Sequence, residues 1–140
     1  MTQNSIIENT IAFVKETLKN AEGGHDWFHI QRVLSNAKLI AKTENVDDFI
    51  VSLGALLHDI ADAKFYDGDE TVGPKVAREF LESQQVDETI IIHVENIIKH
   101  ISFKNSLSSE ERFSSPELDV IQDADRLDAI GAIGIARCFN

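Results

Sequence analysis

The stretch SLGALLHDIADAKF, residues 52–65, places an imidazole and a carboxylate at the end of a mainly apolar segment. The apolar residues run up to Leu57, His58 and Asp59 follow directly, and Asp62 comes one helical turn after His58. A buried helix gains nothing in packing from two adjacent ionisable groups, because burying an unpaired charge is costly. The stretch therefore predicts a functional site at the end of a buried helix.

Apolar residues recur at helical spacing in six segments, of which the central one covers roughly 47–62, and no segment is a convincing strand. The run 90–101 is rich in β-branched residues, but its length and periodicity favour a helix. Residues that commonly cap or open a helix mark the other starts: Ser5 with Glu8, Asp26, Asp87, and Ser115 with Pro116. The sequence therefore predicts an all-α protein, a compact helical bundle.

Length, charge and cysteine content restrict the class of protein. At 140 residues the chain is one domain by length, and its lone cysteine, Cys138, excludes a disulfide within the chain. A net charge of −11 repels phosphate backbones, so nucleic acid is an unlikely partner. The N-terminus lacks the pattern of a signal peptide and no segment is long enough to span a membrane, so we expect a cytoplasmic protein without a membrane partner.

Two further segments have ionisable residues next to the apolar residues of a predicted helix. His29 lies on the apolar stripe of the helix that follows Asp26, and Asp125 lies in the segment QDADRLD. A single histidine on such a stripe is usually a hydrogen-bonded core residue. Three helices that each bring such groups together instead favour a shared divalent cation. The sequence therefore predicts that His29, His58, Asp59 and Asp125 bind one ion, and mixed imidazole and carboxylate ligands suit Mn, Fe, Co, Ni or Zn.

Three motifs resemble those of the HD-domain superfamily of metal-dependent phosphohydrolases, in the order and spacing of its small stand-alone bacterial members. They are HDWFHIQRV (25–33), ALLHDIADAKF (55–65) and QDADRLDAIGAIGIARCF (122–139). The resemblance implies an HD-type helical bundle that binds a divalent transition metal, with manganese the first choice. In the family pattern His29 is the first ligand, His58 and Asp59 are the HD pair, and Asp125 is the last ligand. Asp123 is the main competitor for that last position.

The resemblance also implies hydrolysis of a phosphate ester or anhydride, in a nucleotide or a related phosphorylated small molecule. Asp59 would orient the attacking water, and Asp62 is a candidate for proton transfer, although an exposed structural role is about as plausible. Phosphate oxygens need cationic partners against so acidic a background. The residues chosen for this role lie beside the motifs: Arg32, Lys64, Lys104, Arg126 and His25. Arg126 can equally form a structural clamp with Asp123 or Asp128.

Two other functions stay open from the sequence. The HD scaffold also hosts di-iron redox enzymes, and His93 and His100, seven residues apart on one helix face, could supply extra ligands. A metal- or ligand-binding module without catalysis is the other alternative.

The C-terminal segment is apolar to its end. The predicted stripe of the last helix contains Leu118, Ile121, Leu127 and Ile130. Similar proteins carry further helices after this point, so we expect one HD domain over residues 1–140 without those helices. An uncovered apolar surface also makes a homo-oligomer possible.

Overall fold

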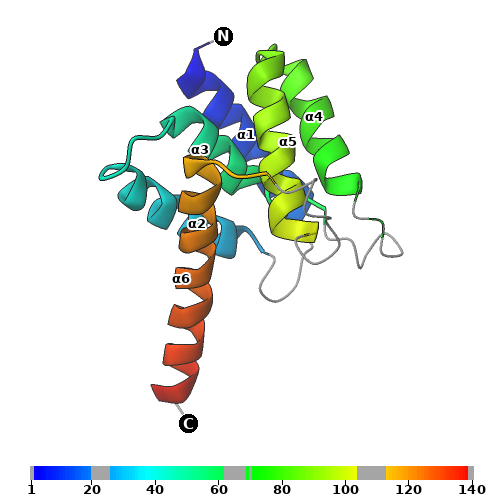
Figure 1. The fold of residues 1–140 in the computed structure, drawn as a ribbon. Helices are drawn as coiled ribbons and strands as arrows, with labels where there is room; N and C mark the ends of the chain where they lie inside the picture. Colours follow the sequence, from blue (N-terminus) through cyan, green and yellow to red (C-terminus); the bar gives the residue numbers. More distant parts are fainter. Residues whose placement is uncertain (1, 20–25, 62–68, 70, 104–112, 139–140) are drawn as a thin grey trace.

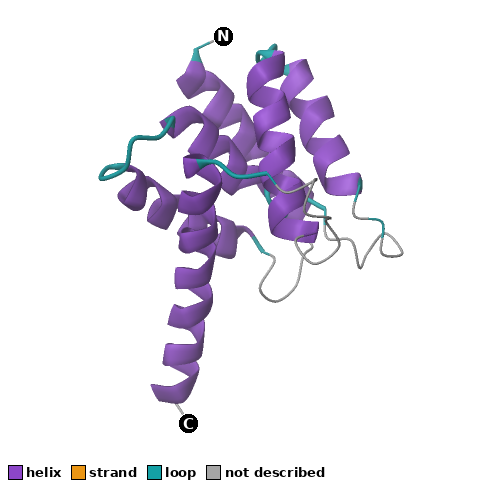
Figure 2. Cartoon of the chain, in the orientation of Figure 1, coloured by secondary structure: helices purple, strands orange, loops and turns teal. Residues whose placement is uncertain are grey.

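The computed structural model describes residues 2–19, 26–61, 69, 71–103 and 113–138. Within these ranges all regular secondary structure is helical, which confirms the all-α prediction (Figures 1 and 2). The helices are α1 (Gln3–Leu18), α2 (Trp27–Ala41), α3 (Asp48–Leu57), α4 (Val72–Ser83), α5 (Glu88–Phe103) and α6 (Pro116–Cys138).

The helices that carry the site begin where the sequence predicted. Asp26 caps α2 by accepting a hydrogen bond from the backbone N–H of His29 at 3.0 Å. The hydroxyl of Ser115 caps α6 by accepting from the backbone N–H of Leu118 at 3.1 Å. Such caps satisfy N–H groups that have no partner within the helix. They fix the helix starts, and hence the positions of His29 and of the residues along α6.

Two predicted helix boundaries are wrong. The helix α1 starts at Gln3, because the Thr2 hydroxyl accepts from the Ser5 backbone N–H at 3.1 Å and Thr2, not Ser5, is the N-cap. The helix α3 ends at Leu57 and not near residue 62. His58 is the C-cap, and its ring bonds back to the carbonyl of Ala55 at 2.7 Å. This local bond occupies a carbonyl that the end of the helix leaves free.

The helix α3 is the centre of the bundle. Every residue from 49 to 57 is buried, and α3 packs against α1, α2, α5 and α6 (Figure 1). Gly54 permits the close approach of α6, because a Cβ atom there would lie 2.5 Å from Cδ1 of the buried Ile121. The end of α3 is therefore held between α2 and α6, which carry the other predicted metal ligands.

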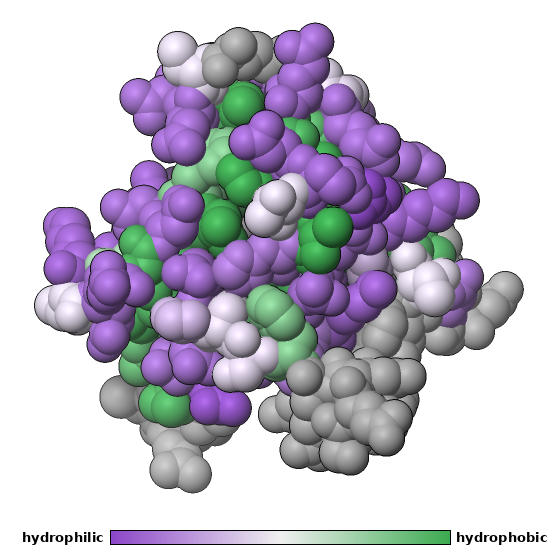
Figure 3. Space-filling view, turned by 45° about the horizontal axis from the view of Figure 1, so that its top comes forward, coloured by the Kyte–Doolittle hydropathy of each residue, from purple (hydrophilic) through white to green (hydrophobic). Residues whose placement is uncertain are grey.

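The C-terminal half of α6 runs beyond the other helices (Figure 1). Leu118 and Ile121 near its start are buried, whereas Leu127 and Ile130 are exposed, so the described part of the chain covers the predicted apolar stripe only at its start. The face of the molecule in Figure 3 is mainly hydrophilic, with hydrophobic side chains in small groups. None of the helices in the described ranges is long and apolar enough to cross a membrane.

We expect Leu53→Ala to lower the free energy of unfolding by about 2–5 kcal/mol, because Leu53 on α3 is fully buried and its truncation leaves a cavity. Leu39→Ala is the matched control on α2, where the side chain is 60% exposed and the cost should stay within about 0.5 kcal/mol. Denaturation in urea measures both changes. Equal losses would show that α3 is not the core of the bundle.

Candidate metal centre

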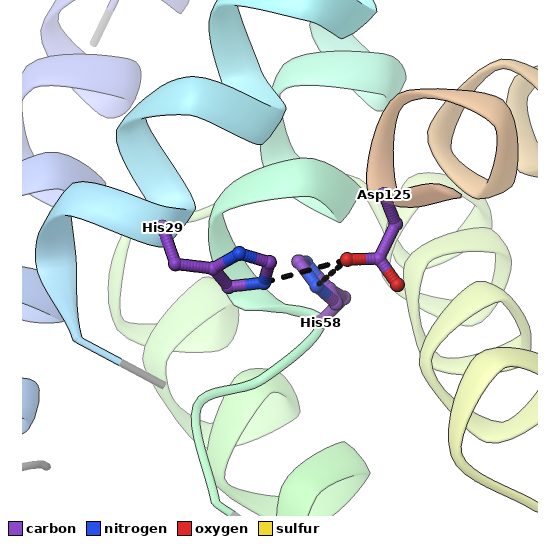
Figure 4. A group of neighbouring side chains, drawn as sticks. All are labelled: His29, His58 and Asp125. Carbon is purple, nitrogen blue, oxygen red and sulfur yellow. Dashed lines mark ion pairs between the residues drawn. The ribbon is translucent and has the colours of Figure 1, made fainter. Parts of the chain in front are cut away.

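Three helices bring His29, His58 and Asp125 together (Figure 4). His29 lies in the first turn of α2, His58 at the C-terminal end of α3, and Asp125 along α6. Oδ1 of Asp125 lies 3.4 Å from Nε2 of His29 and 3.7 Å from Nε2 of His58. One possible ligand atom from each residue lies within 4.8 Å of the others, and this is the only such group of three or more among the described residues.

These separations suit ligands of one ion better than hydrogen bonds. A hydrogen bond between nitrogen and oxygen spans about 2.7–3.2 Å. Two tetrahedral ligands that each lie about 2.1 Å from a metal are about 3.4 Å apart. The observed 3.4 and 3.7 Å therefore leave room for a cation between the carboxylate and the two imidazoles.

The buried imidazole of His58 supplies an independent test of this fit. Its Nδ1 must donate to the Ala55 carbonyl, which only accepts, so Nε2 carries the lone pair of the neutral ring. The residue is 3% exposed, and Nε2 has no hydrogen-bond partner among the described residues. Buried polar atoms are rarely left without a partner. A metal ion at Nε2 would satisfy this nitrogen, so the residues fit the metal that the motifs imply.

His29 is bonded to Asp128, a residue that was not among the predicted site residues. Its Nδ1 lies 2.7 Å from Oδ2 of Asp128, and Arg32 donates from Nε to Oδ1 of the same carboxylate at 2.5 Å. Arg32, expected to contact phosphate, is thus bonded to Asp128 here. The spacing of the residues could have indicated the role of Asp128. His29 and Arg32 are three residues apart, as are Asp125 and Asp128, and residues at this spacing share a helix face.

Asp59 borders the cluster from the turn after α3. Its Oδ2 lies 3.8 Å from Nε2 of His29, and its side chain is partly buried. The carboxylate is therefore on the same side of the His29 ring as Asp125, as expected for two residues near one ion.

The other predicted residues divide into two groups. Asp123 points to the surface, where it lies 3.8 Å from the guanidinium of Arg126, and both side chains are exposed. This pairing corresponds to the clamp alternative for Arg126, and it leaves Asp125 as the aspartate that faces the imidazoles. The remaining predicted residues lie outside the described ranges, so the structure gives no position for them: His25, Asp62, Lys64 and Lys104.

His93 and His100 have contacts away from the cluster. Nε2 of His93 lies 2.9 Å from the hydroxyl of Ser115, and Nδ1 of His100 accepts from the backbone N–H of Phe113 at 3.2 Å. Both rings also contact the ring of Phe113 edge-on. These contacts fasten the segment before α6 to α5, and neither ring belongs to the group of His29, His58 and Asp125.

The imidazoles and carboxylates shift each other's pKa values. The nearby Asp125 carboxylate, with Asp128 and Asp59, outweighs burial and raises the pKa of His29 from 6.5 to about 9. Burial lowers the pKa of His58, but Asp125, Asp59 and the Ala55 carbonyl outweigh it, and the net shift is upward. The imidazoles of His29 and His58 hold the pKa of Asp125 well below its usual range. Without a cation, both imidazoles of the cluster therefore hold a proton more readily than a free imidazole does.

A groove of about 720 Å³ lies between α2 and α6. Arg32, Leu127 and Asp128 are among the described residues that line it, whereas His29, His58 and Asp125 are not. The groove is thus lined by Arg32 and Asp128, which lie behind His29, and not by the three residues of the cluster. We therefore place no substrate in it.

A family model for the HD domain matches residues 27–130, and the chain belongs to this family. A crystal structure of an HD-superfamily hydrolase from Bacillus thuringiensis is 41% identical, with a TM-score of 0.76 over 99% of this chain and 65% of that chain. The protein YpgQ of Bacillus subtilis (strain 168) is 39% identical over 134 residues, 94% of this chain and 64% of YpgQ. The crystal structure of YpgQ in complex with ADP is 36% identical, with a TM-score of 0.72 over 99% of this chain and 66% of that chain. This chain therefore spans less than two thirds of YpgQ.

We expect a metal ion to displace protons from this cluster, because only the unprotonated imidazole binds a metal. At pH 7 His29 is protonated, since its pKa is about 9, so the affinity for Mn²⁺ should fall about tenfold or more for each pH unit below 9. Calorimetry in two buffers of different ionisation enthalpy measures the protons released. Release of no proton at pH 7 would contradict the assignment of His29 to the ion.

The stability of the ion-free chain should depend on pH in a defined way. A folded pKa of His29 raised from 6.5 to about 9 stabilises the fold below pH 6.5, and this contribution is lost as the pH rises through 9. We therefore expect the thermal midpoint to fall between pH 6.5 and 9, and His29→Gln to reduce this fall. Thermal unfolding by circular dichroism measures both. An identical pH dependence in the variant would refute the contribution of His29.

Proposed function

We propose that this chain is the metal-binding core of a metal-dependent phosphohydrolase that cleaves a phosphate ester or anhydride of a nucleotide or related small molecule. The observation that carries the proposal is the cluster of two imidazoles and a carboxylate around the buried Nε2 of His58, for which the described residues offer no hydrogen-bond partner. Membership of the HD domain family and the likeness to an HD-superfamily hydrolase support the same reaction class.

In this proposal the ion is held by His29 and His58 through Nε2 and by the carboxylates of Asp125 and Asp59. Asp59 is included because its Oδ2 lies 3.8 Å from Nε2 of His29. Two nitrogen and two oxygen donors suit a divalent transition metal. Manganese is the first choice, with Fe, Co, Ni or Zn as alternatives.

The roles of the protein residues follow from their positions. When bound, a divalent ion supplies Lewis acidity that polarises a phosphoryl oxygen and makes a water molecule more acidic. Asp59, at the edge of the cluster, would also orient the attacking water, and Asp62 stays a candidate for moving the proton. Arg32 and Arg126 are paired with aspartates, so we assign the phosphate contacts to Lys64, Lys104 and His25 before these two arginines.

A nucleotide is the proposed substrate class. Support comes from YpgQ, which was crystallised in complex with ADP and is 36% identical in that structure. The acidic character of the chain makes a long nucleic acid less suitable than a small phosphorylated molecule.

Release of phosphate or pyrophosphate from a panel of nucleoside mono-, di- and triphosphates tests the proposal, with the full chain loaded with Mn²⁺. We expect turnover that Asp125→Asn lowers by about 100-fold or more, since even the residues that support metal ligands contribute 10–100-fold. Asp123→Asn is the matched control, because Asp123 lies on the same helix but is paired with Arg126 at the surface.

Two results would contradict the proposal. Equal turnover by Asp125→Asn and wild type would separate the activity from the cluster. Mn²⁺ binding at the cluster without turnover of any nucleotide would favour the alternative of a metal-binding module without catalysis.

A further inference from the structure

We propose that Asp128 is a positioning residue that fixes the proton of His29 on Nδ1 and so presents Nε2 to the metal, and that Arg32 holds Asp128 in place. This inference rests on the proposed metal site and deepens it.

The contacts place Asp128 behind the His29 ring. Its Oδ2 lies 2.7 Å from Nδ1, while Asp125 and Asp59 face the other ring nitrogen, Nε2, at 3.4 and 3.8 Å. An ionised carboxylate oxygen can only accept, so Nδ1 must donate, and the lone pair of the neutral ring is then on Nε2. A hydrogen bond of this kind at the second nitrogen sets the orientation and basicity of a metal-binding histidine.

Arg32 secures the carboxylate on its other oxygen. The guanidinium donates from Nε to Oδ1 at 2.5 Å and from Nη2 to Oδ2 at 3.4 Å. The Asp128 side chain is only 11% exposed, whereas that of Arg32 is 55% exposed. Arg32 therefore holds the Asp128 carboxylate from the solvent side. From the surface inward, the order of the bonded groups is Arg32, Asp128 and His29.

Two residues from α2 and two from α6 form both the predicted metal ligands and their support. His29 and Arg32 are one turn apart on α2, Asp125 and Asp128 are one turn apart on α6, and these two helices pack together. One pair, His29 with Asp125, would hold the ion. The other pair, Arg32 with Asp128, supports the first.

A purely structural role is the alternative, in which Arg32 and Asp128 only clamp α2 to α6. Asp128→Asn separates the two roles because it keeps the shape of the side chain. Arg32 only donates, so it selects the amide oxygen of the new side chain and turns its NH₂ group toward His29. Nδ1 must then accept, and the proton of the neutral imidazole moves to Nε2, where it blocks the metal.

The experiment compares wild type, Asp128→Asn, Arg32→Gln and the control Asp123→Asn. Titration calorimetry with Mn²⁺ should show a 10–100-fold loss of affinity in Asp128→Asn, a smaller loss in Arg32→Gln and no loss in Asp123→Asn. Long-range ¹⁵N–¹H NMR spectra of the ion-free proteins at pH 10 report the tautomer of His29. We expect the proton on Nδ1 in wild type and on Nε2 in Asp128→Asn.

An unchanged tautomer in Asp128→Asn would overturn the inference, as would an unchanged Mn²⁺ affinity. A loss of affinity that matches that of Arg32→Gln, with the same tautomer in both variants, would establish the clamp alone. Neither measurement uses catalysis, so a chain that binds Mn²⁺ but hydrolyses nothing would defeat the proposed function and leave this inference standing.

Discussion

The burial of His58 at the end of α3 is the constraint on which the site depends. A run of buried residues carries α3 through the middle of the bundle, and the first residue after the helix is an imidazole that stays inside. Its Nδ1 bonds to the helix that has just ended, so Nε2 is left facing Asp125 without a hydrogen-bond partner in the part of the chain that the structure describes. Leaving a buried polar atom unpaired costs about 1–3 kcal/mol. This free-energy cost falls on Nε2 of His58, the atom where a bound metal ion would remove it.

The helices α2 and α6 complete the site, the first through its capped start and the second through its close packing on α3. The cap at Asp26 fixes where α2 begins, so His29 falls in its first turn beside the end of α3. The helix α6 lies along both, and Gly54 lets it approach closely enough for Asp125 to face the two imidazoles. The candidate metal centre is therefore a product of helix packing and not of a single loop, which explains why residues nearly 100 positions apart can converge.

The sequence predicted the helices and the convergence of His29, His58 and Asp125, because periodicity and caps are local signals and the motifs have a fixed order. It failed where an alternative local partner decided the outcome. Thr2 took the cap expected of Ser5, and the ring of His58 bonded to the end of α3, which was expected to continue. The sequence also did not predict the bond between Arg32 and the carboxylate of Asp128, 96 residues away, because only the packing of α2 on α6 brings the two together. The expectation that Arg32 contacts phosphate stays a prediction.

A crystal structure of the chain soaked with Mn²⁺, with anomalous diffraction to locate the ion, would show whether His29, His58 and Asp125 bind one metal. We predict one strong peak within about 2.0–2.3 Å of Nε2 of both His29 and His58 and of a carboxylate oxygen of Asp125. A peak bound elsewhere, with Nε2 of His58 still without a partner, would contradict it.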